Sequence, residues 1–233
     1  MRVNLFISRD YNLRPRSGSR CYRISGFSRF TGWYILRILE ILKSCQAFVL
    51  AGGASRRMGT DKSQLRLEQQ TFAERISETL LKVTDSVTIV GHQYSNLPSV
   101  ADIYPQWGAL GGLHAALTAC QREWAIVAAC DLPFVTPELF QQLAALRLDH
   151  EAVVPLQPDG RAQPLAALYR IDPCRQRATG LIEAGRRRPL DLLEAVNTRW
   201  VQFAEIRNLH QSEKFFVNIN TPEDYYEATG HSL

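Results

Sequence analysis

The sequence has few cysteines, and their spacing is unlike that of a disulfide framework or a zinc site. Its 233 residues contain five cysteines, an odd number, and no two of them form a CxxC pair. We therefore expect a protein of a reducing compartment, the cytoplasm. The chain also lacks an apolar run of the roughly 20 residues that a membrane-spanning helix needs, so we expect a soluble protein.

The sequence shows no Ser-His-Asp or Cys-His spacing typical of covalent catalysis, and each of its five histidines is isolated. What it does have is an ordinary globular composition. Hydrophobic residues make up 45% and charged residues 21%, which excludes wholesale disorder and allows a sizeable core.

Basic charge is concentrated at one end of the chain. The net charge of +4 divides into +7 for residues 1–46 and −3 for the remainder, so we expect no nucleic-acid partner for the main body. We assign residues 1–45 to a basic extension and 46–233 to one domain. The Arg- and Ser-rich extension ends in an amphipathic pattern at Trp33–Lys43. It fits a transit peptide, a membrane-surface helix, a disordered tail or a segment upstream of the native start.

The body alternates short apolar runs with helical patterns, which predicts an α/β fold, a three-layer αβα sandwich with a mostly parallel sheet. The expected strands are Ala47–Leu50, Val87–Val90, Ala125–Ala129, Ala152–Pro155, Leu165–Tyr169, Val201–Ile206 and Phe215–Ile219. The expected helix starts are Thr71 with Glu74, Thr136 with Pro137, and Thr221 with Pro222.

The first strand is followed by a segment suited to phosphates. Residues 50–62 read LAGGASRRMGTDK, in which two adjacent glycines permit close backbone approach and three cations can grip a triphosphate. The spacing fits neither a P-loop nor a dinucleotide fingerprint. The alternative is an ordinary glycine turn with solvated arginines. Because the segment combines a glycine pair with three cations, we favour phosphate binding over this alternative.

A second candidate site follows a fully apolar strand. Residues 124–131 read WAIVAACD, and a strand buried on both faces ends in the single carboxylate of Asp131. A hard oxygen ligand beside a triphosphate suits Mg²⁺, whereas an aspartate at a strand end is also an ordinary turn residue.

The motif at residues 50–62 resembles the LAGGxSxRMGxDK signature of molybdenum cofactor guanylyltransferases, a family of Rossmann-like nucleotidyltransferases. The resemblance extends over roughly Gln46–Glu227 and includes CDxP at Asp131 and a C-terminal segment of the form N[IV]NTPE[DE]. It implies a single nucleotidyltransferase domain that transfers GMP from Mg·GTP to molybdenum-loaded molybdopterin and releases pyrophosphate. Molybdoenzymes or other cofactor-assembly proteins are the protein partners that such an activity implies.

The resemblance also implies roles for individual residues. Arg57 and Lys62 would act on the phosphates as catalytic cations, and Asp131 would bind the metal. The nucleotide would be contacted by Leu50, Ala51, Gly52, Gly53, Lys62, Asp102 and Asp131. A glycine-rich loop at Gly108–Gly112, close to Asp102, would lie against the base.

The acceptor half is less defined by the sequence. Asn218 and Asn220 would share one face of the last expected strand, where their amide oxygens could reach the metal or the acceptor. Asn220 could instead only order the turn before the helix. Two cation-bearing segments, Asp159–Leu165 and Gly185–Arg188, fit either an anionic pterin phosphate or solvated loops.

Two alternatives remain beside guanylyl transfer. The chain could transfer CMP to the same cofactor, or a nucleotide to a sugar phosphate. It could also be a non-catalytic module that carries nucleotide or cofactor.

The charge asymmetry generates a first prediction. Removing residues 1–44 should leave nucleotide transfer intact, because the extension differs from the body in charge and composition. Transfer activity and circular dichroism of the shortened protein measure this. Loss of more than about half the activity, or of the fold, would show that the extension packs on the domain.

Overall fold

The computed structural model describes residues 43–51, 66–67, 70–91, 97–104, 107–219 and 221–229. The strands are β1 (Cys45–Leu50), β2 (Arg66–Leu67), β3 (Gln70–Thr71), β4 (Val87–Val90), β5 (Ser99–Val100), β6 (Trp124–Ala129), β7 (Ala152–Pro155), β8 (Ala166–Arg170) and β9 (Thr198–Val201). The helices are α2 (Phe72–Leu81), α3 (Ala109–Ala119), α4 (Pro137–Ala145), α5 (Ile171–Glu183), α6 (Pro189–Ala195), α7 (Phe203–Ile206), the 3₁₀ turn η2 (Ser212–Lys214) and α8 (Pro222–Thr229).

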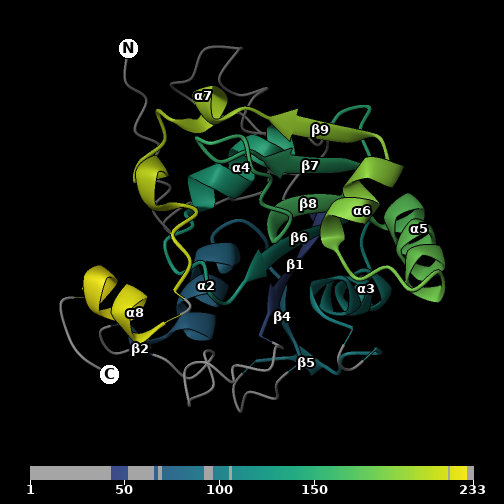
Figure 1. The fold of residues 1–233 in the computed structure, drawn as a ribbon, viewed down its shortest axis with the longest axis horizontal. Helices are drawn as coiled ribbons and strands as arrows, with labels where there is room; N and C mark the ends of the chain where they lie inside the picture. Colours follow the sequence, from purple (N-terminus) through teal and green to yellow (C-terminus); the bar gives the residue numbers. More distant parts are fainter. Residues whose placement is uncertain are drawn as a thin grey trace, which may run out of the picture. The chain divides into compact units, whose positions relative to one another are not determined.

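Seven strands form one sheet in the order β5-β4-β1-β6-β8-β7-β9 (Figure 1), and β2 pairs with β3 separately. Every neighbouring pair in the large sheet is parallel except those that involve β8. The expectation of a mostly parallel sheet is therefore confirmed. The single reversal follows from a short connection, because residues 156–165 return the chain directly beside β7 rather than through a crossover helix.

Helices cover both faces of this sheet, which confirms the three-layer sandwich. Ala47, Val49 and Ile126 face α2 and α4, whereas Phe48 and Val127 on the same strands face α3, α5 and α6. Figure 1 shows α2 on one side of the sheet and α3, α5 and α6 on the other. This alternation is what strands buried on both faces require.

Most predicted strands and all three helix starts are confirmed. The Val87–Val90 and Ala152–Pro155 boundaries are those of β4 and β7. The Thr71 hydroxyl accepts from the Glu74 amide while the Glu74 carboxylate accepts from Thr71 N–H, at 3.2 and 2.9 Å, which is the expected capping box. Thr136 precedes Pro137 at a helix start as expected, but its side chain makes no capping hydrogen bond.

Two predicted strands are wrong. The Val201–Ile206 strand ends at Val201, because Gln202 and Glu205 form a capping box that starts the short helix α7. The Phe215–Ile219 strand is absent, and this segment is irregular. Phe215 and Ile219 are fully buried while Val217 between them is 40% exposed, so the segment is anchored at two points rather than by the alternation of a strand.

Among the described residues, no helix is both long and apolar enough to cross a membrane. None of the four described cysteines forms a disulfide.

Two helix glycines differ in the space around them, and this generates a second prediction. A Cβ on Gly111 would lie 2.9 Å from Trp107 Cβ and 3.0 Å from the Tyr104 carbonyl oxygen, whereas a Cβ on Gly180 would meet nothing within 4 Å. Gly111→Ala should therefore lower the free energy of unfolding by about 1–3 kcal/mol through overpacking. Gly180→Ala should raise it by about 0.5–1 kcal/mol through helix propensity. Urea unfolding of the two variants measures both changes, and equal effects would contradict the close packing at Gly111.

Candidate functional site

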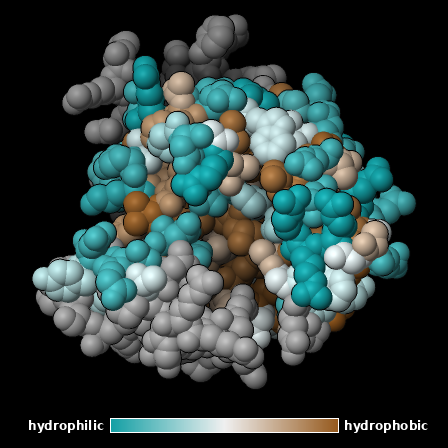
Figure 2. All heavy atoms as spheres, viewed as in Figure 1, coloured by the Kyte–Doolittle hydropathy of each residue, from teal (hydrophilic) through white to brown (hydrophobic). Residues whose placement is uncertain are grey.

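The candidate site lies where β1 and β6 end side by side. From β1 the sheet extends through β4 to β5 in one direction and through β6 to β9 in the other. In open parallel sheets, ligands bind at the carboxyl ends of the strands where the strand order reverses in this way. The amide of Cys130 donates to the Leu50 carbonyl at 3.0 Å and continues the β1–β6 pairing to the strand ends. Figure 2 shows apolar atoms at the floor of a hollow over β1 and β6, with hydrophilic residues to its left and right.

The nucleotide-contacting residues expected on β1 lie at this edge. Leu50 is the last residue of β1 and is 6% exposed, and the Ala51 amide donates to the Val90 carbonyl at 2.9 Å. The backbone of both residues is therefore held by strands on either side. A rigid main chain at a strand end is a suitable support for a ligand.

Asp131 follows the end of β6 and is half-buried at the same edge. Its carbonyl oxygen accepts a hydrogen bond from the Ile219 amide at 3.0 Å. The Pro133 carbonyl accepts from Arg75 Nε on α2 at 3.0 Å, which fixes the loop that leaves β6. Asp131 is thus anchored through its main chain to the C-terminal segment.

Asn218 is exposed and does not lie on a strand. It is next to Ile219, whose amide donates to the Asp131 carbonyl, so its backbone lies near Asp131. It lines a hollow of about 250 Å³ together with Phe134, Lys214, Val217, Asp224 and Glu227. The strand-face argument for pairing Asn218 with Asn220 is therefore wrong. Burial of Phe72 against Ile219, with Phe134 and Tyr225 packed around them, secures this segment instead.

Asp102 lies beyond β5 beside the start of α3. Its Oδ1 accepts from the Tyr104 amide at 2.9 Å, and partial burial raises the pKa of its carboxyl above the ordinary value. His114 on α3 is 6% exposed, donates to or accepts from Thr179 Oγ1 at 3.0 Å, and has a pKa lowered by burial. His114 is thus a core histidine.

The glycine-rich segment Gly108–Gly112 is a helix start and not a loop, which corrects the sequence prediction. Gly108, at φ +71°, is the N-cap of α3, and its carbonyl accepts from the amides of Gly111 and Gly112. Gly112 lies beside the end of β1, where an added Cβ would make an ordinary contact with Leu50 Cδ1 at 3.8 Å. The start of α3 therefore lies close to the end of β1.

The two cation-bearing segments differ in how they are held. In the first, Arg161 Nε contacts Asp159 Oδ2 at 2.6 Å on an exposed turn between β7 and β8. In the second, Arg186 and Arg188 both bind the Asp191 carboxylate, with shortest distances of 2.6 and 2.9 Å. Asp191 is 4% exposed, and the hydrogen bonds from these two guanidinium groups hold the pKa of its carboxyl well below the ordinary value.

Several predicted site residues lie outside the described part of the chain. They are Gly52, Gly53, Arg57, Lys62 and Asn220. Across the described residues, no group of three or more His, Cys, Asp or Glu side chains is placed to hold a metal ion. Mg²⁺ is commonly held by one or two carboxylates together with substrate phosphates, so a single Asp131 fits a metal that arrives with its nucleotide.

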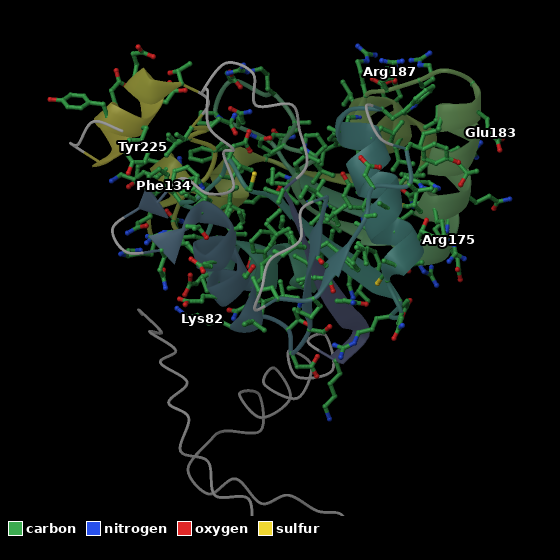
Figure 3. All side chains as sticks on the ribbon, turned by 90° about the horizontal axis from the view of Figure 1, so that it is seen from below. Lys82, Phe134, Arg175, Glu183, Arg187 and Tyr225 are labelled. Carbon is green, nitrogen blue, oxygen red and sulfur yellow. The ribbon has the colours of Figure 1, made fainter. Side chains whose placement is uncertain are left out.

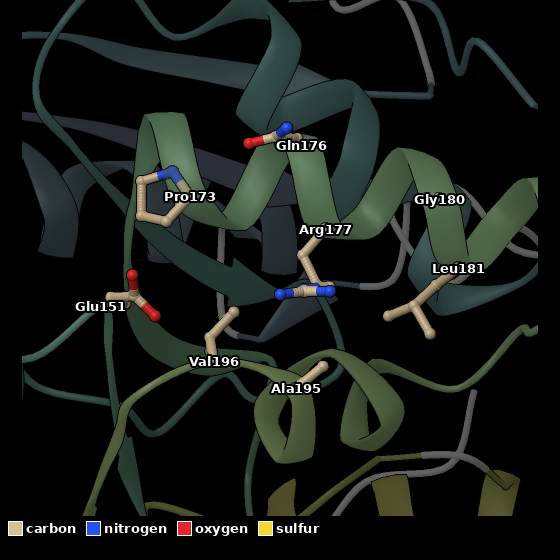
Figure 4. Close-up of a pocket in the computed structure, with 8 residues that line it drawn as sticks. All are labelled: Glu151, Pro173, Gln176, Arg177, Gly180, Leu181, Ala195 and Val196. Carbon is tan, nitrogen blue, oxygen red and sulfur yellow. The ribbon is translucent and has the colours of Figure 1, made fainter.

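A larger hollow of about 640 Å³ lies elsewhere, between α5 and α6 (Figure 4). Glu151, which precedes β7, lines one end of it, and Arg177 lies between α5 and α6. The amino end of β7 is at the opposite edge of the sheet from Leu50. This hollow is therefore separate from the candidate site.

The sequence did not point to Trp107 or Asp191. Trp107 Nε1 donates to the Arg186 carbonyl at 2.8 Å, across 79 positions in the sequence. Asp191 follows three arginines and a helix-starting proline. This local charge pattern was the signal that could have indicated an ion pair at Asp191.

Comparisons with known proteins agree with this geometry. A family model described as the MobA-like NTP transferase domain matches residues 47–198. A protein of Pelotomaculum thermopropionicum named as a probable molybdenum cofactor guanylyltransferase is 32% identical, covering 77% of this chain and 89% of its own. A protein of the same name from Methanosarcina mazei is 33% identical, covering 80% and 90%.

Among solved structures, molybdopterin-guanine dinucleotide biosynthesis protein A from Archaeoglobus fulgidus superposes with a TM-score of 0.67 at 26% identity. The match covers 79% of this chain and 97% of that one. These similarities confirm the family resemblance seen in the sequence motifs.

The Asp191 cluster generates a third prediction. Because the pKa of Asp191 is lowered in the folded state, its charge stabilises the fold above the ordinary carboxyl pKa of about 3.9, and this contribution is lost as the pH falls further. Asp191→Asn should lower Tm at pH 7, and the difference from wild type should shrink below about pH 4.

Thermal unfolding between pH 7 and pH 3 measures this difference. Asp85→Asn is the control, since Asp85 pairs with Arg122 while its side chain is 70% exposed. A Tm difference that stays constant with pH would show that Asp191 acts through packing and not through its charge.

Proposed function

This chain belongs to the MobA-like NTP transferase family, and we propose that it transfers GMP from GTP to the phosphate of molybdenum-loaded molybdopterin. The observation that carries the proposal is the match to relatives named for this activity, at 32–33% identity over most of both chains. The position of the candidate site at the β1–β6 strand ends supports it, because the motif of residues 50–62 begins there.

The reaction exchanges one phosphoanhydride bond for another. An oxygen of the acceptor phosphate attacks the α-phosphorus of GTP, the bond between that phosphorus and the bridging oxygen breaks, and pyrophosphate leaves with the bond electrons. Such a reaction asks the protein to align two anions and to offset their charge. Backbone amides, cations and a carboxylate are sufficient groups for this task.

We assign the roles by the motif. The backbone of Leu50, Ala51, Gly52 and Gly53 would contact the nucleotide, Arg57 and Lys62 would neutralise its phosphates, and Asp102 would lie on the nucleoside side. Asp131 would hold a divalent metal, for which we propose Mg²⁺. Such a metal, when bound, would offset negative charge on the phosphoryl oxygens. Asn218 and Asn220 would face the metal or the acceptor.

We propose a cytoplasmic location, since the absence of disulfides among the described cysteines fits a reducing compartment. We also propose that the product passes to molybdoenzymes or other assembly proteins, and that residues 1–45 are an extension outside the transferase domain.

Nucleotide specificity separates this function from its alternatives. Radiolabelled GTP, CTP and ATP, each with molybdopterin and Mg²⁺, should give labelled product only with GTP. A CMP product would establish cytidylyl transfer instead. Binding of GTP without release of pyrophosphate would indicate a carrier module.

A fourth prediction concerns Asp131. Asp131→Asn keeps the size and one oxygen but removes the charge, so turnover should fall by roughly 10²–10³ while Tm stays unchanged. Raised Mg²⁺ should restore part of the loss. Asp172→Asn is the matched control, since the Asp172 side chain is 91% exposed on α5.

Thermal unfolding and Mg²⁺-dependent GMP transfer should be measured on the same samples. If Asp131 served only the turn after β6, the variant would lose Tm while its folded molecules turned over normally. That result would contradict the metal-binding role.

A further inference from the structure

Three consecutive arginines join α5 to α6, and the structure distinguishes their roles. Arg186 donates to both oxygens of the buried Asp191 carboxylate, and Arg188 donates to one of them, Oδ1. These donors are therefore directed at a buried group, whose single negative charge offsets one of the two positive charges. Arg187 lies between them and has no described carboxylate as a partner.

Arg187 is held against an aromatic ring instead. Its Cζ lies 4.7 Å from the centroid of the Trp107 ring, within the range of a cation–π contact. The Trp107 indole is itself fixed, because its Nε1 donates to the Arg186 carbonyl at 2.8 Å. This arrangement restricts the Arg187 side chain while it remains exposed.

The Arg187–Trp107 pair lies at the edge of the sheet that carries the candidate site. Helix α5 follows Arg170, which pairs with Trp124 at the amino end of β6. The helix therefore starts at the edge of the sheet opposite the candidate site and ends at the edge that carries the site. Figure 3 shows Arg187 beyond one end of α5 and Arg175 nearer the other. The backbone of Arg187 lies beside Gly108, since a Cβ there would be 3.9 Å from the Arg187 carbonyl oxygen.

The pair also connects the two halves of the sheet. Helices α5 and α6 pack over β7 and β8, whereas Trp107 precedes α3 and follows β5. An acceptor approaching a nucleotide bound at the β1–β6 junction would meet this boundary. The first turn of α3 contains no acidic residue that would repel an anion there.

We infer that Arg187, positioned by Trp107, binds the phosphate of the acceptor. The ligand class is a phosphomonoester dianion, and the inference rests on the proposed function. Transfer brings this dianion against a triphosphate, so the acceptor needs a cation of its own beside those of residues 56–62. A guanidinium presents paired N–H donors to phosphate oxygens, and one that is already held in place loses less freedom on binding.

Steady-state kinetics of GMP transfer test the inference. Arg187→Gln should raise the KM for molybdopterin roughly 10- to 100-fold, the loss expected for charge-assisted hydrogen bonds, and leave the KM for GTP within about twofold. Trp107→Phe keeps an aromatic ring but loses the hydrogen bond to the Arg186 carbonyl, so a smaller rise in the KM for molybdopterin is expected. Arg175→Gln, which removes an exposed arginine near the other end of α5, should change neither constant.

A binding measurement without turnover provides an independent readout. Titration with inorganic phosphate should change the tryptophan fluorescence of wild type and Arg175→Gln in a saturable way, and Arg187→Gln should lose this response. If that response appears but wild type transfers no GMP, the proposed function is wrong and the anion site stands.

Other results would overturn the inference itself. Unchanged phosphate binding and an unchanged acceptor KM in Arg187→Gln would show that Arg187 is only a surface residue. A rise in the GTP KM alone would show that Arg187 serves the nucleotide, while GMP transfer as the function would remain valid.

Discussion

The parallel pairing of β1 with β6 is the constraint on which the rest of the structure depends. Six residues of each strand are in register, and the Cys130–Leu50 hydrogen bond extends the pairing to the strand ends. This pairing places the end of β1, Leu50 and Ala51, beside Asp131 after β6, although about 80 residues separate them in sequence. Without it, the first residues of the proposed phosphate-binding motif and the proposed metal ligand would have no common edge.

Packing around this junction fixes the neighbouring segments through few, specific contacts. Gly111 lets α3 approach the loop of Tyr104, and Gly112 lies beside the side chain of Leu50. On the other side, the Ile219 amide ties the C-terminal segment to the carbonyl of Asp131. The buried Asp191 orders the arginine segment between α5 and α6. Each contact positions backbone at the same edge of the sheet, which suits a reaction that depends on alignment and charge.

The sequence predicted the parts of this fold that depend on local pattern. Apolar runs located β4 and β7, and the Thr71–Glu74 spacing identified the start of α2. The strand predicted at Phe215–Ile219 is wrong, because its buried apolar residues pack against other parts of the core and do not belong to a β-sheet. The Trp107–Arg186 contact was likewise inaccessible, since it joins residues 79 positions apart. The neighbouring arginines were a local signal for the pairing of Asp191, but its burial depends on tertiary packing.

If this edge of the sheet joins GMP to a pterin phosphate, mass spectrometry can detect the product. Molybdopterin incubated with the protein and Mg·GTP should gain one GMP, and an equal amount of pyrophosphate should be released. An unmodified pterin in the presence of folded, GTP-bound protein, or a product formed equally well from CTP, would contradict this proposal.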